Sequence, residues 1–172
     1  MKITAYIHPW RTAVTPTGVG NHIIQMITSL TREPGVEVKL LTSRQDLTNG
    51  HIDARSPLST LPALGHPLSR TIMERLWLLT GHPTADRWAG NPDWIYCPAE
   101  TFVATRKASL AVTVHDTYSL EPDLPWSNTP EHKRIRWRAE LMFKPIRRHA
   151  KLILAVSEFT KSRLVTLLDF DP

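Results

Sequence analysis

The sequence has a single cysteine, Cys97, among its 172 residues, and this excludes an internal disulfide. It also has no apolar run near the roughly 20 residues that a membrane-spanning helix needs. The opening residues, MKITAYIHPW, carry one lysine and an apolar stretch too short and too interrupted for a secretory signal. We therefore expect a cytoplasmic protein and leave open a peripheral contact with the inner face of a membrane.

Glycine is scarce as well, with seven residues. Two of them lie in Thr17-Gly18-Val19-Gly20, well after the first predicted strand, and no third glycine follows at the spacing of a dinucleotide fingerprint. Ser43-Arg44, after the second predicted strand, could still hold a 2′-phosphate, so an NADP-dependent oxidoreductase stays as one alternative. The eight histidines show no metal-binding spacing with supporting carboxylates, so we assign no metal and no tightly bound cofactor.

The overall composition is that of one ordinary globular domain, with 41% hydrophobic and 22% charged residues. The formal net charge of +5 favours acidic partners such as phosphates or anionic lipids. No aromatic stacking platform and no recognised nucleic-acid motif accompany this charge, so we expect no nucleic acid partner. We expect residues 1–172 to form a single domain.

Short β-rich runs alternate with helical patterns along the chain. Residues 45–67 are broken by prolines and are expected to form loops. Pro145 is expected to kink or interrupt a helix. The alternation predicts an α/β fold with a doubly wound, mostly parallel sheet that carries helices on both faces. The predicted strands are 3–7, 36–42, 93–97, 110–114 and 152–156, and the predicted helices are 21 to the break at 33–35, 69–80, 130–149 and 158–168.

Two features fall where such a sheet binds ligands, at the carboxyl ends of its strands. Residues 18–20 lead as a loop into a helix N-terminus, whose amides and dipole favour an anion, although a flexible loop without function is the alternative. His115 and Asp116 follow the apolar strand 110–114. His115 could exchange a hydrogen bond with a ligand, while Asp116 biases its tautomer or holds the loop. Ser157 lacks the glycines of a nucleophile elbow, so we interpret it as a helix cap and not as part of a triad.

A basic stretch covers residues 132–148. The simplest interpretation is a solvated charged face over an apolar stripe. The alternative is a surface that contacts anionic lipid or a phosphorylated acceptor, which would also suit a stand-alone anion- or lipid-binding module. The candidate acceptor or membrane contacts are Tyr118, Arg134, Trp137, Arg138, Arg147 and Arg148.

Three segments occur in an order and at separations that resemble the N-terminal half of the retaining family 4 glycosyltransferases. They are TGVGNHIIQMITSL, LAVTVHDTYSLEPDLP and RRHAKLILAVSEFTKSRLVTLL. Lys151 in the third segment stands where the family more often has an aspartate, before the strand and away from the cleft. The resemblance implies the Rossmann-like N-terminal half of a GT-B fold, in which an acceptor-side domain faces a donor-binding domain across a cleft.

The same resemblance implies roles for individual residues. Gly18 and Gly20 would face the phosphates or sugar of a nucleotide-sugar donor, and His115 matches the family histidine that contacts the donor sugar near the reacting carbon. A metal-independent, retaining transfer to a glycan or lipid-linked acceptor is implied, of a mannosyl- or rhamnosyltransferase type in polysaccharide assembly. The family's diphosphate-binding residues belong to the second domain, and no counterpart follows Leu168. We therefore expect an acceptor-side domain that is inactive alone.

Overall fold

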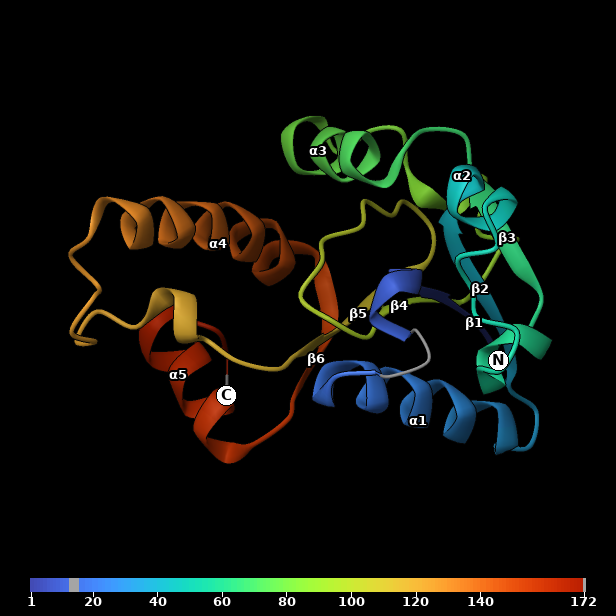
Figure 1. Ribbon diagram of the computed structural model, residues 1–172, viewed down its shortest axis with the longest axis horizontal. Helices are drawn as coiled ribbons and strands as arrows, with labels where there is room; N and C mark the ends of the chain where they lie inside the picture. Colours follow the sequence, from blue (N-terminus) through green and yellow to red (C-terminus); the bar gives the residue numbers. More distant parts are fainter. Residues whose placement is uncertain (13–15, 172) are drawn as a thin grey trace.

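Strands and helices alternate along the chain in the computed structural model, which describes residues 1–12 and 16–171 (Figure 1). The strands of this part are β1 (Lys2–Tyr6), β2 (Glu37–Ser43), β3 (Ala63–His66), β4 (Trp94–Cys97), β5 (Ser109–Val114) and β6 (Ala150–Ala155). The α-helices are α1 (Gly18–Arg32), α2 (Arg44–Thr48), α3 (Arg70–Thr80), α4 (Pro130–His149) and α5 (Glu158–Leu168). Short 3-10 turns are η1 (Pro9–Thr12), η2 (Pro57–Thr60), η3 (Ala85–Arg87) and η4 (Tyr118–Leu120).

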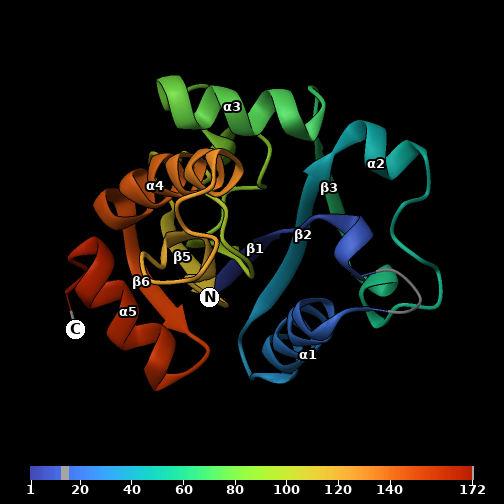
Figure 2. The ribbon, with the colours of Figure 1, turned by 60° about the vertical axis from the view of Figure 1, so that its left-hand side comes forward.

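All six of these strands pair in parallel, in the order β3-β2-β1-β4-β5-β6. Helix α1 packs on one face of the sheet, whereas α3 and α4, with residues of α5, pack on the other (Figure 2). The strand order reverses between β1 and β4, and ligands of such sheets bind at the carboxyl ends of the strands near this point. The predicted doubly wound α/β fold is confirmed.

The central strand β5 shows why the sequence forms this sheet. Leu110, Val112 and Val114 point into the core beneath α3 and α4, and Ala111 points into the core beneath α1. Successive side chains of a strand alternate between faces, so a strand covered on both sides is mostly apolar, and the buried Thr113 of β5 shares a hydrogen bond of 2.8 Å with the Tyr96 hydroxyl. Full burial of each large aliphatic side chain stabilises the fold by about 1.5–3 kcal/mol.

The structure contradicts the loops expected over residues 45–67 and an interruption of the helix at Pro145. Residues 45–67, expected as loops, contain most of α2 together with η2 and the short edge strand β3. The Ser43 hydroxyl caps α2 by accepting a hydrogen bond from the Asp46 amide at 3.0 Å. In the sequence, a capping serine before a helix of only five residues cannot be distinguished from the turn residues around it. The helix α4 runs through Pro145 without interruption. The proline removes only the amide that would bind the Leu141 carbonyl, and Leu141 lies on the exposed side of the helix, where water can bind that carbonyl.

The strand β6 is only half covered. It lies at the edge of the sheet, and Leu152 is 45% exposed. Leu152 and Leu154 line an open apolar depression of about 340 Å³ beside α1. An aliphatic run is equally compatible with a central strand and with an edge strand, so the sequence pattern alone could not distinguish them.

The first turn of α1 explains one of the two neighbouring glycines. Thr17 caps this helix, and its hydroxyl accepts the Gly20 amide. A Cβ at Gly20 would lie 2.0 Å from the Arg11 carbonyl oxygen, whereas a Cβ at Gly18 would have no neighbour within 4 Å. Close packing therefore requires glycine at position 20 and not at position 18.

We predict that Gly20→Ala lowers the free energy of unfolding by about 1–3 kcal/mol, because the backbone of η1 must move away from α1. Gly18→Ala is the matched control and should change it by less than about 0.5 kcal/mol. Urea unfolding of both variants checks this, and equal stability of the two would contradict it.

A partly buried carboxylate attaches α3 to the end of β1. Glu74 accepts a hydrogen bond from the Tyr6 hydroxyl at 3.0 Å and lies 2.7 Å from His8 Nε2. Burial raises the pKa of Glu74, but the hydrogen bond and charge of His8, with the Tyr6 hydroxyl, outweigh this and hold that pKa below its usual value. The charged form of Glu74 therefore stabilises the folded chain.

We predict that Glu74→Gln lowers the free energy of unfolding by about 1–2 kcal/mol at pH 7. The folded pKa lies below the unfolded value of about 4.3, so the difference from the native chain is present above that pH and shrinks as the pH falls through the folded value. Urea unfolding at several pH values measures it, with the exposed Glu140→Gln as control. A difference that stayed constant down to pH 3 would overturn this assignment.

Candidate functional site

The two features expected at the carboxyl edge of the sheet lie together in the structure. His115 directly follows β5, and Gly18 begins α1. The ring of His22, one helical turn after Gly18, meets the ring of His115 edge to face, with 4.8 Å between ring centroids. The start of α1 and the end of β5 therefore form one continuous edge.

The His115 ring is held by the loop after the neighbouring strand. Its Nε2 lies 2.9 Å from the Pro98 carbonyl oxygen. A carbonyl oxygen only accepts, so Nε2 carries a proton, and in the neutral form of an imidazole the other nitrogen, here Nδ1, is the acceptor. The Glu100 carboxylate accepts the backbone amides of His115 and Asp116, which ties the two loops together. The ring is thus fixed in orientation with one nitrogen unused by Pro98.

His22 is a neutral partner for this ring. Burial lowers the pKa of His22, and the nearby His115 lowers it further. Its Nε2 is buried and has no hydrogen-bond partner among residues 1–12 and 16–171. An imidazole nitrogen can exchange a hydrogen bond with a hydroxyl group, and Nδ1 of His115 is the nitrogen that Pro98 does not use.

The segment Gly18-Val19-Gly20, expected as a loop, forms the first turn of α1. Gly18 is exposed, and the space beside its Cα is open. Gly20 is buried against the backbone of η1, so its Cα is covered by the chain itself. The first amides of a helix lack intrahelical partners, and Gly18 and Val19 provide them here, at the positive end of the helix dipole.

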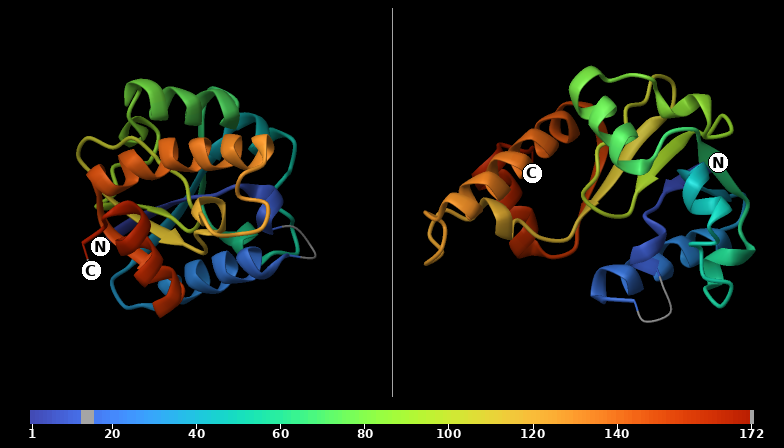
Figure 3. Two further views of the ribbon diagram at one scale, coloured as in Figure 1. Left: turned by 90° about the vertical axis from the view of Figure 1, so that its left-hand side faces the viewer. Right: turned by 45° about the horizontal axis from the view of Figure 1, so that its top comes forward.

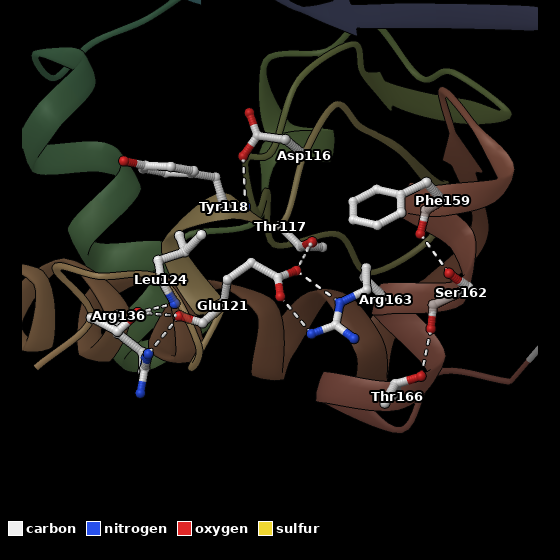
Figure 4. A network of polar contacts seen from close by, with 11 residues as sticks. Asp116, Thr117, Tyr118, Glu121, Leu124, Arg136, Phe159, Ser162, Arg163 and Thr166 are labelled. Atoms are coloured by element: carbon white, nitrogen blue, oxygen red, sulfur yellow. Dashed lines mark hydrogen bonds and ion pairs between the residues drawn. The ribbon is translucent and has the colours of Figure 1, made fainter.

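The loop after His115 is stabilised by its own carboxylates. The Asp116 carboxylate accepts the Tyr118 amide at 3.0 Å, so this side chain holds the loop and does not contact the His115 ring. Farther on, the Glu121 carboxylate accepts hydrogen bonds from Nε and Nη2 of Arg163 and from the Thr117 hydroxyl, as Figure 4 shows. The hydrogen bond from Arg163 lowers the pKa of Glu121. These contacts fix the path of the chain from β5 towards α4.

The remaining predicted contacts lie on α4 and beside its start. Tyr118 is exposed and its ring is 6.1 Å from the ring of His132, in the first turns of α4. Arg147 lies 3.5 Å from the Asp169 carboxylate, an exposed ion pair that connects α4 to the end of α5. The candidates whose side chains extend from α4 into solvent are Arg134, Trp137, Arg138 and Arg148.

The sequence also offered Ser157 as a possible nucleophile and Ser43-Arg44 as a possible 2′-phosphate site, and these residues make structural contacts. Ser157 caps α5 by accepting the Thr160 amide at 3.1 Å, as predicted. The Ser43 hydroxyl donates to Asp46, and the Arg44 guanidinium donates to the Gly65 carbonyl at 3.3 Å. In residues 1–12 and 16–171, no group of three or more His, Cys, Asp or Glu side chains could hold a metal ion.

Sequence reasoning missed His22 and Glu100. His22 lies four residues after Gly18, a spacing that places both on one side of the helix and could have indicated it. Glu100 follows β4 by three residues, at the same edge as His115, so the predicted parallel sheet pointed to it. Its role is a contact between loops, and no short motif encodes such a contact.

Comparison with known proteins agrees with this geometry. The model of the family described as Glycosyltransferase Family 4 matches residues 16–172. No curated protein and no solved structure matches the chain. The match includes α1 with Gly18 and His22, the end of β5 with His115, and α5, so it covers every element of this edge except the end of β1. The chain belongs to glycosyltransferase family 4.

Proposed function

We propose that this chain is the acceptor-side domain of a retaining glycosyltransferase. The complete enzyme would move a sugar from a nucleotide-sugar to a glycan or lipid-linked acceptor, with mannosyl transfer in polysaccharide assembly as the specific reaction. A donor-binding domain outside residues 1–172 would hold the nucleotide. We place the reaction in the cytoplasm, at the inner face of a membrane.

One observation supports this proposal above all others. The fixed ring of His115 and the open first turn of α1 lie on the same edge, joined through His22. A nucleotide-sugar needs two kinds of contact at its reacting end, hydrogen bonds to sugar hydroxyls and stabilisation of the diphosphate as it leaves. An imidazole serves the first purpose and a helix N-terminus serves the second.

The chemistry assigned to these residues is electrostatic. The bond between the anomeric carbon and the diphosphate oxygen breaks, and the acceptor oxygen bonds to that carbon from the same face. The acceptor's proton passes to the departing diphosphate. The amides of Gly18 and Val19 favour the developing negative charge, because they are oriented before the reaction begins. Nδ1 of His115 accepts a hydrogen bond from a sugar hydroxyl and holds the ring of the donor in place.

We predict that His115→Ala, made in the enzyme with its donor domain, reduces kcat by about 100-fold or more. The fold should persist, because the His115 side chain is only partly buried. Release of nucleoside diphosphate from a panel of nucleotide-sugars measures the rate. His51→Ala is the matched control, since this histidine is exposed and pairs with Asp46 after α2. A His115→Ala enzyme as fast as the His51→Ala enzyme would refute the proposed role.

We also predict that residues 1–172 alone transfer no sugar, because the proposed donor contacts on the other side of the cleft are not in this chain. The purified chain, mixed with nucleotide-sugars and acceptor glycans, should release no nucleoside diphosphate above background. Transfer by this chain alone would show that it binds donor and acceptor without a second domain.

A further inference from the structure

Helices α3 and α4 present a surface that the transfer reaction does not explain. They lie side by side over the same face of the sheet and contact each other (Figure 3). Neither helix, nor any other among residues 1–12 and 16–171, is both long and apolar enough to cross a bilayer. Large apolar side chains nevertheless stay exposed on both of them.

The outer side of α4 combines apolar and cationic side chains. The buried residues Ala139, Phe143 and Ile146 define its inner side. Residues spaced by three, four and seven positions share one side of a helix. The stripe opposite the buried side consists of Arg134, Trp137, Arg138, Leu141 and Arg148, all exposed, with Trp137 at 59%.

The outer side of α3 continues the same pattern. Met73 and Trp77 face the core. On the opposite side lie Ile72, Arg75 and Leu79, and Leu79 is 79% exposed. Together with the α4 stripe, these residues form what we call the outer α3–α4 surface. The solvent-facing side of a helix usually carries polar side chains, because burial of large apolar side chains is favourable.

The acidic residues of both helices avoid this surface. Glu74 of α3 points inward to Tyr6 and His8. On α4, Glu131 and Glu140 lie about a quarter turn to either side of the stripe, given 3.6 residues per turn. The outer α3–α4 surface is therefore cationic and apolar at once.

We propose that the outer α3–α4 surface rests on an anionic lipid bilayer. Arginine side chains reach lipid headgroups, while Trp137, Leu141 and Leu79 enter the boundary between headgroups and acyl chains. A dissolved polyanion would gain from the arginines but not from exposed leucine and isoleucine side chains. The mixture of charge and apolar area thus favours a bilayer over a polyanion.

The surface leads to the candidate site. Tyr118 and Trp126 are both exposed, their rings lie 6.1 Å apart, and the Tyr118 ring is next to His132 of α4. Tyrosine and tryptophan favour the boundary between water and lipid. They lie between the loop of His115 and the start of α4, so a bilayer under α4 would bring a lipid-linked acceptor beside the sheet edge. This inference concerns location, and it can fail while the proposed transfer reaction stands, or the reverse.

Vesicle sedimentation of the 172-residue chain tests the inference without any sugar donor. We expect binding to vesicles of equal parts phosphatidylglycerol and phosphatidylcholine, and at least tenfold weaker binding to phosphatidylcholine alone. Binding should weaken as sodium chloride rises from about 0.05 to 0.5 M. Arg134→Glu/Arg138→Glu should reduce it by about tenfold or more, and Trp137→Ala should reduce it at unchanged charge.

Matched variants separate this surface from net charge. Arg138→Glu and Arg32→Glu make the same charge change, but Arg32 is exposed at the end of α1, across the sheet. Only Arg138→Glu should weaken binding by more than about twofold, and circular dichroism of both should match the native chain. Equal effects of the two variants, no binding by the native chain, or retention on heparin without vesicle binding would each overturn the inference.

Discussion

The parallel pairing of β5 between β4 and β6 is the constraint on which the candidate site depends. Because these strands run in the same direction, their following loops emerge at one edge. The loop after β4 supplies the Pro98 carbonyl and the Glu100 carboxylate, and both bind the residues that follow β5. The Thr160 hydroxyl in the first turn of α5 donates to the His115 carbonyl at 3.4 Å, on the side of β6. His115 is therefore held from both neighbouring connections, and its ring orientation is a property of the sheet and not of its own loop.

The carboxylates around this edge are used to fold it. Glu100 accepts two backbone amides, Asp116 accepts one, and Glu121 binds Arg163. Glu100 and Asp116 thereby satisfy backbone amides that the turns would otherwise leave without partners. The groups left available include the first amides of α1 and Nδ1 of His115, so the edge offers donors beside an acceptor. This balance suits a ligand that carries phosphate at one end and hydroxyl groups at the other, which supports the proposed nucleotide-sugar.

The sequence predicted the order of the long elements because their patterns are local. The helical spacing of Ile23 and Ile27 and the apolar run of β5 follow directly from which sides are buried. Patterns failed where the outcome depends on distant neighbours. Leu152 belongs to an aliphatic run that could serve any position in a sheet, and only the strand order places it at an open edge. Gly20 looked like a ligand contact, and its reason is the carbonyl of Arg11, nine residues earlier. At the site, His115 was predictable as the residue after a buried strand, whereas the contact between His22 and His115 exists only once α1 has packed beside β5.

The position of the basic stretch acquires meaning from the fold. In the sequence, residues 132–148 read as a charged helix with an inner apolar stripe, and that interpretation is correct for the buried side. The exposed apolar and cationic stripe of α4 is extended by that of α3 because the two helices lie next to each other in the fold. In the sequence they are separated by 49 residues, 81–129, so their proximity cannot be seen there. One helix alone would give a narrow line of contact, whereas two adjacent helices give a broader surface. Since α4 begins beside Tyr118, at the edge that carries His115, the outer α3–α4 surface and the candidate site meet at one end of α4. A lipid-linked acceptor in a bilayer under this surface would need no separate route to the site, because the bilayer would restrict its headgroup to the edge where the donor sugar is proposed to lie.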